Sequence, residues 1–191
     1  VDTARSTGKI TKANYDKFPS TKLTGMLVQG WDSIISMLKE KMDARKVLAV
    51  DLYTGVYEEE VLDAFSKEFS GRVMNVRDLM KPEKEIQALT ECFMTEDVLF
   101  GYVTNLKLED YLDVDKVAAA RKQISEAKET IVIIGTGASV VAPQDAMVVY
   151  ADMARWEIQQ RFRRHEVKAL GIDNRNDAVS LQYKRGYFND W

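Results

Sequence analysis

A glycine-rich turn is the stretch of this sequence best suited to chemistry. It runs through residues 135–139 (Gly-Thr-Gly-Ala-Ser) and follows the β-branched residues 131–134. That order predicts a strand ending in a tight loop, where backbone N–H groups can meet an anion. We therefore expect ligand-binding groups at Gly135, Gly137 and Ser139.

Four arginines follow this turn in a segment that is predicted to be a helix, residues 153–164, and three of them are candidates for ligand binding. The planar guanidinium group of arginine matches the oxygens of a phosphate, so Arg155, Arg161 and Arg164 are candidates for an anion clamp. The alternative is that they stabilise the helix itself. Glu157 and Arg161 are four residues apart, and such a pair contributes about 0.2–0.5 kcal/mol.

An aspartate is the next candidate. Asp78 comes just after the predicted strand at residues 72–76, and open α/β sheets bind ligands at the carboxyl ends of their strands. The alternative is a turn or a helix cap, which is a common structural use of aspartate. We assign no residue a catalytic role, and the sequence calls for no cofactor.

A second glycine turn, Thr54-Gly55, follows residues 46–53, which have the mostly apolar character of a strand buried on both faces. Strand, glycine turn and helix is the order used by phosphate-binding folds. Here, however, residues 58–60 are all glutamate and fill the first helical turn. Carboxylates there favour the helix dipole but repel an incoming anion. We predict that this turn does not bind phosphate.

The hydrophobic pattern predicts the scaffold that positions these candidates. Apolar residues at helical spacing indicate a helix at 31–42, and strand-like stretches then alternate with helical ones. The predicted fold class is α/β, a three-layer, mainly parallel sheet flanked by helices. Residues 97–103 also have the composition of a strand. We expect a flexible arm at 1–20, one α/β domain at 21–170, and an aromatic connector or docking tail at 171–191.

Composition limits the expected partners. The 27 basic and 30 acidic residues give a net charge of -3, which offers no whole-surface attraction to nucleic acid or to an anionic membrane. The apolar runs are shorter than the roughly 20 residues of a membrane span. No signal-peptide pattern is present, so we expect a cytoplasmic protein.

The ligand types for a metal site are also scarce. Cys92 is the only cysteine and His165 the only histidine, so neither an internal disulfide nor a tetrahedral zinc site is expected. An acidic group at residues 109–115 is interpreted as a helix cap, with a cation site as the alternative. We therefore assign no metal ligand.

The order of these elements resembles that of uridine-kinase-type nucleoside kinases of the P-loop class, over about residues 46–165. In that family an aspartate after the second strand acts near the substrate hydroxyl, and arginines after a late strand reach the phosphates. The nearest matches are Asp78, Arg155, Arg161 and Arg164. The resemblance implies a P-loop-kinase-like domain, but the lysine and Ser/Thr of the phosphate loop are missing.

Nearly the whole chain also resembles the N-terminal, non-catalytic region of certain long bacterial class I mannose-6-phosphate isomerases. The matching segments are NYDKFPSTK at residues 14–22, GTGAS at 135–139, YADMARWEIQ at 150–159 and KRGYFNDW at 184–191. In those proteins a zinc-bearing cupin barrel follows and supplies the isomerase chemistry. This resemblance implies a cupin isomerase domain or subunit as the partner.

Two functions are consistent with these observations. The first is a catalytically degenerate, kinase-like accessory domain associated with a mannose-6-phosphate isomerase, which docks or senses a sugar phosphate or nucleotide. The second is an active nucleoside or sugar kinase whose unconventional phosphate loop is the turn at residues 135–139. The missing zinc-cupin residues exclude isomerase chemistry within this chain.

Overall fold

The structure of the protein is a computed structural model that describes Asp16 and residues 19–22, 24–42 and 44–190. The predicted arm at residues 1–20 therefore lies mostly outside the described residues, as does Trp191 at the end of the predicted tail.

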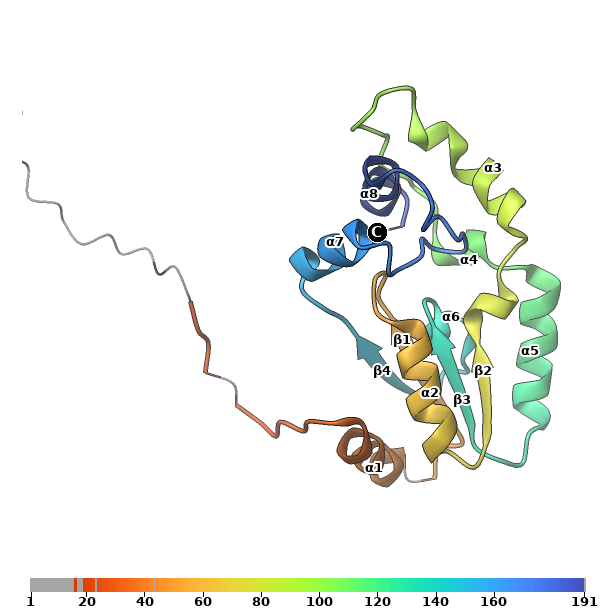
Figure 1. Ribbon diagram of the computed structural model, residues 1–191. Helices are drawn as coiled ribbons and strands as arrows, with labels where there is room; N and C mark the ends of the chain where they lie inside the picture. The colour runs from red at the N-terminus through yellow and green to blue at the C-terminus, as the bar shows by residue number, and fades with distance from the viewer. Residues whose placement is uncertain (1–15, 17–18, 23, 43, 191) are drawn as a thin grey trace, which may run out of the picture.

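The fold is built on a four-stranded, all-parallel sheet with helices on both faces, which confirms the predicted α/β class (Figure 1). The strand order is β2-β3-β1-β4. The pairing places Asp51 of β1 level with Gly135 of β3, so the two central strands end together. The strands are β1 (Val47–Leu52), β2 (Arg72–Asn75), β3 (Ile131–Gly135) and β4 (Met147–Ala151).

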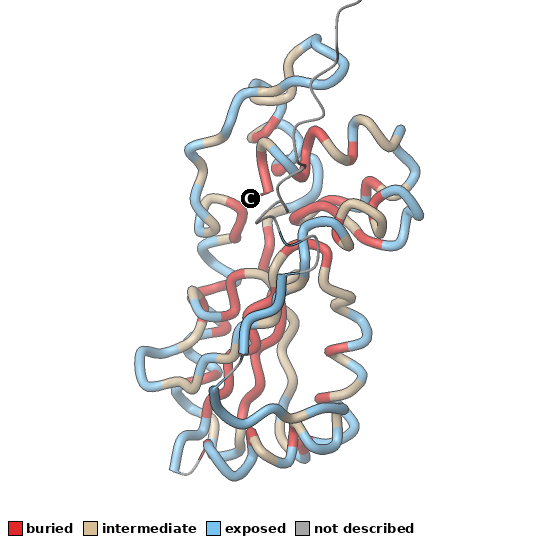
Figure 2. The backbone as a smooth tube through the Cα atoms, turned by 90° about the vertical axis from the view of Figure 1, so that its left-hand side faces the viewer, coloured by how far each residue is buried: buried red, intermediate tan, exposed pale blue. Residues whose placement is uncertain are grey.

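The two central strands form the hydrophobic core because their side chains alternate between two covered faces. Every residue of β1 and β3 is buried, and these strands make the buried centre of the tube in Figure 2. Leu48 and Val50 pack on one face, with helices α1 (Trp31–Met42) and α2 (Glu58–Glu68). On the other face Ala49 packs with α5 (Val114–Glu126) and α6 (Ala138–Val141).

A third group of elements lies beyond the carboxyl ends of the strands, in the upper half of Figure 1. There α8 packs against both α3 and α7. The group comprises the 3-10 turn η1 (Val76–Leu79) and the helices α3 (Glu83–Met94), α4 (Leu108–Tyr111), α7 (Arg155–Arg163) and α8 (Val179–Phe188).

Two segments differ from the sequence-based expectation. Residues 97–103 do not form a strand, and they run instead as an irregular exposed loop. The side chain of Asp97 accepts the backbone N–H groups of Leu99 and Phe100 at 2.7 Å, so the loop satisfies part of its backbone locally.

Residues 171–190 are folded into the domain rather than forming a tail. Arg185 and Asp190 are buried, and the carboxylate of Asp190 accepts the backbone N–H of Leu170 at 3.1 Å. The hydroxyl of Thr54, in the turn after β1, donates to the backbone carbonyl of Asp190 at 3.3 Å. The C-terminal segment therefore closes over the carboxyl end of the sheet.

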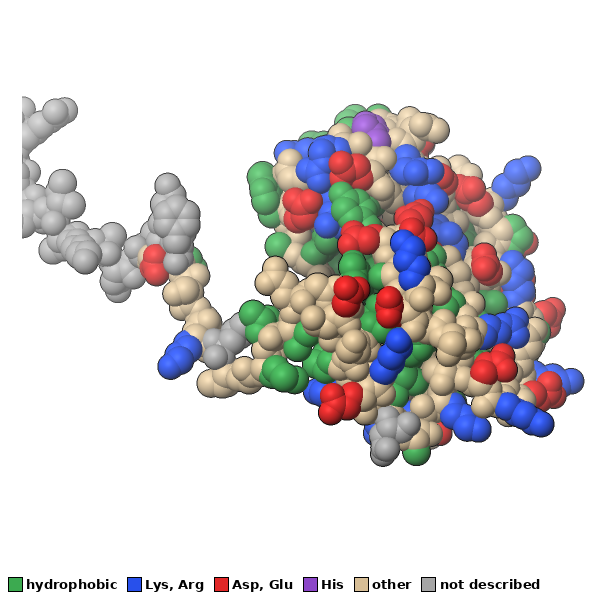
Figure 3. Space-filling view, turned by 60° about the horizontal axis from the view of Figure 1, so that its bottom comes forward, with side chains coloured by type: hydrophobic (Ala, Val, Ile, Leu, Met, Phe, Trp, Pro, Cys, Tyr) green, Lys and Arg blue, Asp and Glu red, His purple; other side chains and the backbone are tan. Residues whose placement is uncertain are grey.

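Acidic and basic side chains are interspersed over the face of the molecule shown in Figure 3. That face carries no broad surface of a single charge, in keeping with the net charge of -3. Among the described helices, none combines the length and the apolar character that a membrane crossing requires.

Candidate functional site

The carboxyl ends of β1 and β3 form the position where an open α/β sheet binds a ligand. From β1 the chain crosses to β2 on one side of the sheet, and from β3 it crosses to β4 on the other side. Adjacent strands whose connections run in opposite directions leave a crevice between their carboxyl ends. A cavity of about 40 Å³ lies there, lined by the turn after β1, by Gly135 and Thr136, and by residues 166–170.

The Gly135–Ser139 turn is held by a buried carboxylate. Asp51 at the end of β1 accepts the backbone N–H of Gly137 at 2.9 Å and that of Ser139 at 3.0 Å. The hydroxyl of Ser139 donates to the same carboxylate. Gly137 is the N-cap residue of the four-residue helix α6 and has φ +89°. Glycine adopts this left-handed backbone conformation readily, so the turn itself accounts for the glycine. The donors predicted to meet a phosphate thus bind Asp51 instead.

The turn after β1 is closed by an arginine from α7. The guanidinium of Arg161 donates to the carbonyl of Gly55 at 2.9 Å and stacks over the ring of Tyr57, 3.6 Å from its centroid. Gly55 has φ +93°, and a Cβ there would lie 2.7 Å from the side chain of Ile158. Backbone, arginine and aromatic ring therefore leave this turn little room for a ligand.

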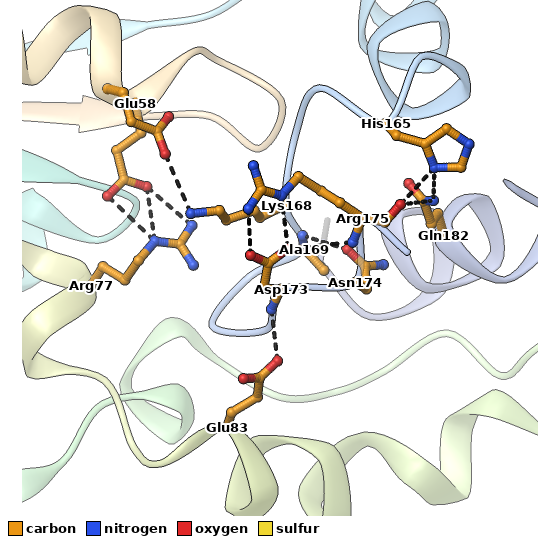
Figure 4. Close-up of polar contacts among 11 residues, drawn as sticks. Glu58, Arg77, Glu83, His165, Lys168, Ala169, Asp173, Asn174, Arg175 and Gln182 are labelled. Carbon is orange, nitrogen blue, oxygen red and sulfur yellow. Dashed lines mark hydrogen bonds and ion pairs between the residues drawn. The ribbon is translucent and has the colours of Figure 1, made fainter. Parts of the chain in front are cut away.

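Two ion pairs from α2 lie among the residues that line the cavity, and Figure 4 shows the one between Glu58 and Arg77. Arg77, which follows β2, donates to Glu58 at 3.1 and 3.2 Å through two nitrogens. Lys168 donates to Glu59 at 3.3 Å. The pKa of Glu59 lies below its usual value, chiefly because the residue's own backbone N–H donates to the carboxylate. The hydrogen bond and the charge of Lys168 lower it further. Both glutamates lie in the first turn of α2, where they favour the helix dipole.

The three predicted arginines do not come together as one clamp. Arg161 and Arg164 both bind Glu157, at 3.2 and 3.0 Å, and Arg164 also binds Glu166 at 2.8 Å. Hydrogen bonds from Arg164 and from a tyrosine hydroxyl lower the pKa of Glu166 to about 2. Arg155 lies instead beside α8, 5.5 Å from the ring centroid of Tyr187. The helix-stabilising Glu157–Arg161 pair is therefore present.

Asp78 lies outside the cavity. It is exposed on η1, whereas the cavity is lined by its neighbour Arg77. The side chain that caps η1 is Asn75, which accepts the backbone N–H of Arg77 at 2.8 Å.

The acidic residues 109–115 were the alternative cation site. Asp113 caps α5 there by accepting the N–H groups of Asp115 and Lys116 at 3.0 Å, as the sequence predicted. Within the part of the chain that the structure describes, no three His, Cys, Asp or Glu side chains are grouped to hold a metal ion.

A wider hollow of about 940 Å³ opens at the opposite, amino-terminal edge of the sheet, between α5 and the segment before β4. Its lining includes Arg45, Lys46 and Arg121. Parallel sheets bind ligands at their carboxyl ends, so the crevice at β1 and β3 remains the candidate site.

Comparison with known proteins supplies a family. Residues 30–191 match the family described as "Domain of unknown function (DUF8485)". The chain belongs to the DUF8485 family. The match covers the whole parallel sheet and all the elements of the candidate site. No curated protein was found to match this DUF8485 chain.

Several residues of the site were missed by the sequence analysis. Asp51 was detectable as a lone carboxylate inside an apolar strand, because a buried charge requires partners. Arg77 and Lys168 gave no such signal, because each is a single basic residue with no motif around it. Among the predicted residues, the structure brings Gly137 and Ser139 together on Asp51, and Arg161 and Arg164 together on Glu157. Gly135 lines the cavity.

Proposed function

We propose that this DUF8485 chain is a catalytically silent accessory module of kinase-like architecture that docks onto another protein. The observation that carries the proposal is the Asp51 carboxylate, which accepts the Gly137 and Ser139 N–H groups. A carboxylate in that position stands where a phosphate would, and it repels one. A kinase needs an open phosphate cradle with a lysine, and this turn has neither.

The other glycine turn supports the same proposal. Glu58 and Glu59 occupy the first turn of α2, and Arg161 binds the carbonyl of Gly55. The cavity between the turn and residues 166–170 has about 40 Å³, room for a few water molecules at most by the usual measure of about 10–15 Å³ each. A nucleotide does not fit in this arrangement.

An exposed apolar loop provides a docking surface. Val98, Leu99, Phe100, Tyr102 and Val103 are each 62–70% exposed within one stretch of six residues. Single exposed hydrophobic residues are ordinary, but a contiguous group of them marks an interaction surface. The sequence resemblance proposes the partner, a cupin-type mannose-6-phosphate isomerase.

A sugar-phosphate sensor is the second candidate function. The observation in its favour is that Arg77 and Lys168 reach the mouth of the cavity from different elements. An anion could bind there only by displacing Glu58 and Glu59 from their ion pairs. Titration with mannose 6-phosphate tests this candidate, and saturable binding that is lost in Lys168→Met would support it.

The docking proposal is tested by mixing the purified chain with a purified cupin-type mannose-6-phosphate isomerase in sedimentation experiments. We expect a complex that is lost in the variant Leu99→Ser/Phe100→Ser. Val114→Ser is the matched control, because Val114 is an exposed apolar residue on α5. Absence of any complex with the intact chain would contradict isomerase docking, and phosphoryl transfer from ATP would contradict catalytic silence.

A further inference from the structure

A groove runs along α3, between that helix and the segment that leads into α8. Its volume is about 580 Å³. One wall is a face of α3 that includes Glu83, Gln87 and Glu91, and the other is formed by residues 172–174 with Asp177, Leu181 and Arg185. The groove is separate from the cavity at the carboxyl ends of β1 and β3.

The groove is lined by a buried amide with an unused donor. Asn174 is 4% exposed, and its Oδ1 accepts the backbone N–H of Ala169 at 2.9 Å, which fixes the orientation of the amide (Figure 4). Its Nδ2 atom has no hydrogen-bond partner among the described residues. A buried amide N–H group requires an acceptor, so this atom points to a ligand that supplies one.

A buried arginine also lines the groove, and it is paired within the fold. Arg185 is 7% exposed and donates through one terminal nitrogen to the hydroxyl of Thr90 at 2.8 Å. Its Nε lies 3.9 Å from the carboxylate of Asp190 and makes no hydrogen bond within the described part of the chain. The Oδ1 of Asp190 also has no hydrogen-bond partner among the described residues, so the Nε of Arg185 faces this carboxylate. Asn174 therefore supplies the unused donor of the groove, and that donor suits a carbonyl oxygen.

The rim of the groove has the opposite character. Glu91 and Asp177 line it without a salt bridge among the described residues. The carboxylate of Glu83 accepts the backbone N–H of Asp173 at 2.7 Å, and Asp173 is paired with Arg175 at 2.6 Å. Lys84 is the one lysine in the lining. Acidic groups around a low-dielectric hollow attract a cation and disfavour a free anion.

We propose that the groove between α3 and α8 binds a basic, extended peptide segment of a partner protein. An extended segment has free backbone carbonyls for Asn174, which a helix interior lacks, and its Lys or Arg side chains meet the acidic rim. Leu181 and Met94 provide apolar contacts. The 12 residues of α3 span about 18 Å, the length of roughly five or six extended residues.

The probe is a fluorescent hexapeptide that alternates lysine and leucine, with blocked termini, and a glutamate–leucine hexapeptide is its counterpart. Fluorescence polarisation at low salt should show saturable binding of the lysine peptide only. The variant Glu91→Gln/Asp177→Asn should weaken it about fivefold, as expected for two exposed ion pairs. Asp32→Asn, an exposed carboxylate of α1, is the matched control and should leave the affinity unchanged.

A second measurement tests the donor. In ¹⁵N-correlated NMR spectra the side-chain amide of Asn174 should shift on addition of the lysine peptide, while that of exposed Asn105 should not. Preferential binding of the glutamate peptide, an unmoved Asn174 amide, or no binding of either peptide would each overturn the proposal.

The inference rests on the docking role proposed above and adds a second surface to the loop at residues 98–103, and the two can fail separately. An isomerase complex that forms while the lysine peptide does not bind would remove the groove and keep docking. If the peptide binds in the groove but the chain transfers phosphoryl groups, the groove is kept and the catalytically silent docking role is contradicted.

Discussion

The carboxylate of Asp51 accepts the backbone N–H of Ser139 at 3.0 Å, linking the end of β1 to the glycine turn after β3. The two residues are 88 positions apart in the chain. With the Gly137 N–H at 2.9 Å, this contact makes the turn a structural joint between the central strands. The groups that could cradle an anion are therefore part of the fold's own hydrogen bonding.

Replacing Asp51 with alanine should destabilise the protein. The side chain is 8% exposed, and its loss leaves the Gly137 and Ser139 N–H groups without their partner. We expect the free energy of unfolding to fall by about 2–4 kcal/mol, measured by urea titration. Asp145→Ala, at an exposed carboxylate, should change it by less than about 0.5 kcal/mol. Equal effects of the two substitutions would refute the structural role.

Gly55 and Gly30 separate two costs of adding a Cβ atom. Both have positive φ, +93° and +87°, but only at Gly55 would the new atom meet a neighbour, Ile158 at 2.7 Å. We expect Gly30→Ala to cost about 1 kcal/mol and Gly55→Ala about 2–4 kcal/mol, because the second also overpacks the site. Thermal unfolding of the two variants measures the difference, and a Gly55→Ala protein no less stable than Gly30→Ala would be inconsistent with the tight turn.

Burial raises the pKa of Asp190 to about 6 from 3.8, despite the nearby Arg185 and the hydrogen bond from Leu170. Between pH 3.8 and about 6 the folded state therefore keeps the proton on Asp190, whereas the unfolded state releases it. The contribution of the protonated carboxyl to the free energy of unfolding is complete below about pH 4. It should be lost as the pH rises through 6, by ~3 kcal/mol.

Asp190→Asn isolates this effect because it cannot titrate. Between pH 4 and 6 the unfolding free energy of the wild type should fall relative to that of the variant. Above about pH 7 the difference between the two should stay constant. Glu166 acts in the opposite direction and at lower pH: its pKa is lowered to about 2, so its contribution is lost as the pH falls below its ordinary 4.5. A flat difference from pH 4 to 7 would rule out a raised pKa at Asp190.

The Arg77–Glu58 pair should be worth more than an exposed pair. Their side chains are 33% and 17% exposed, against 74% and 79% for Lys67 and Asp63. Double-mutant cycles to alanine should give a coupling of about 1 kcal/mol for the first pair and about 0.3 kcal/mol for the second. Indistinguishable couplings would show that solvent screens the cavity mouth as fully as the open surface.

Local sequence patterns predicted the features that depend on local structure. The apolar run and glycine turn of β3 and the buried Ile158 and Phe162 of α7 are as expected from periodicity. The sequence predicted a helix from residue 153, but α7 begins at Arg155, and Ala154 is exposed. Helix ends depend on flanking contacts that periodicity does not record.

Features that depend on distant contacts could not be read from the sequence. The loop 97–103 has strand-like residues, but the backbone N–H groups of Leu99 and Phe100 donate to the side chain of Asp97 instead of to a neighbouring strand. Asp51 binds a turn more than 80 residues away, as its separations of 86 and 88 show. The predicted clamp separated because Arg155 packs toward α8, a helix that the sequence placed in a tail.

The central claim is that the glycine turn is structural and that the chain does not use a nucleoside triphosphate. Its most direct test is calorimetric titration of the unmodified chain with ATP and Mg²⁺. The predicted result is heat no greater than that of dilution, because Asp51 occupies the N–H groups of Gly137 and Ser139. Saturable binding of ATP and Mg²⁺ would contradict the claim.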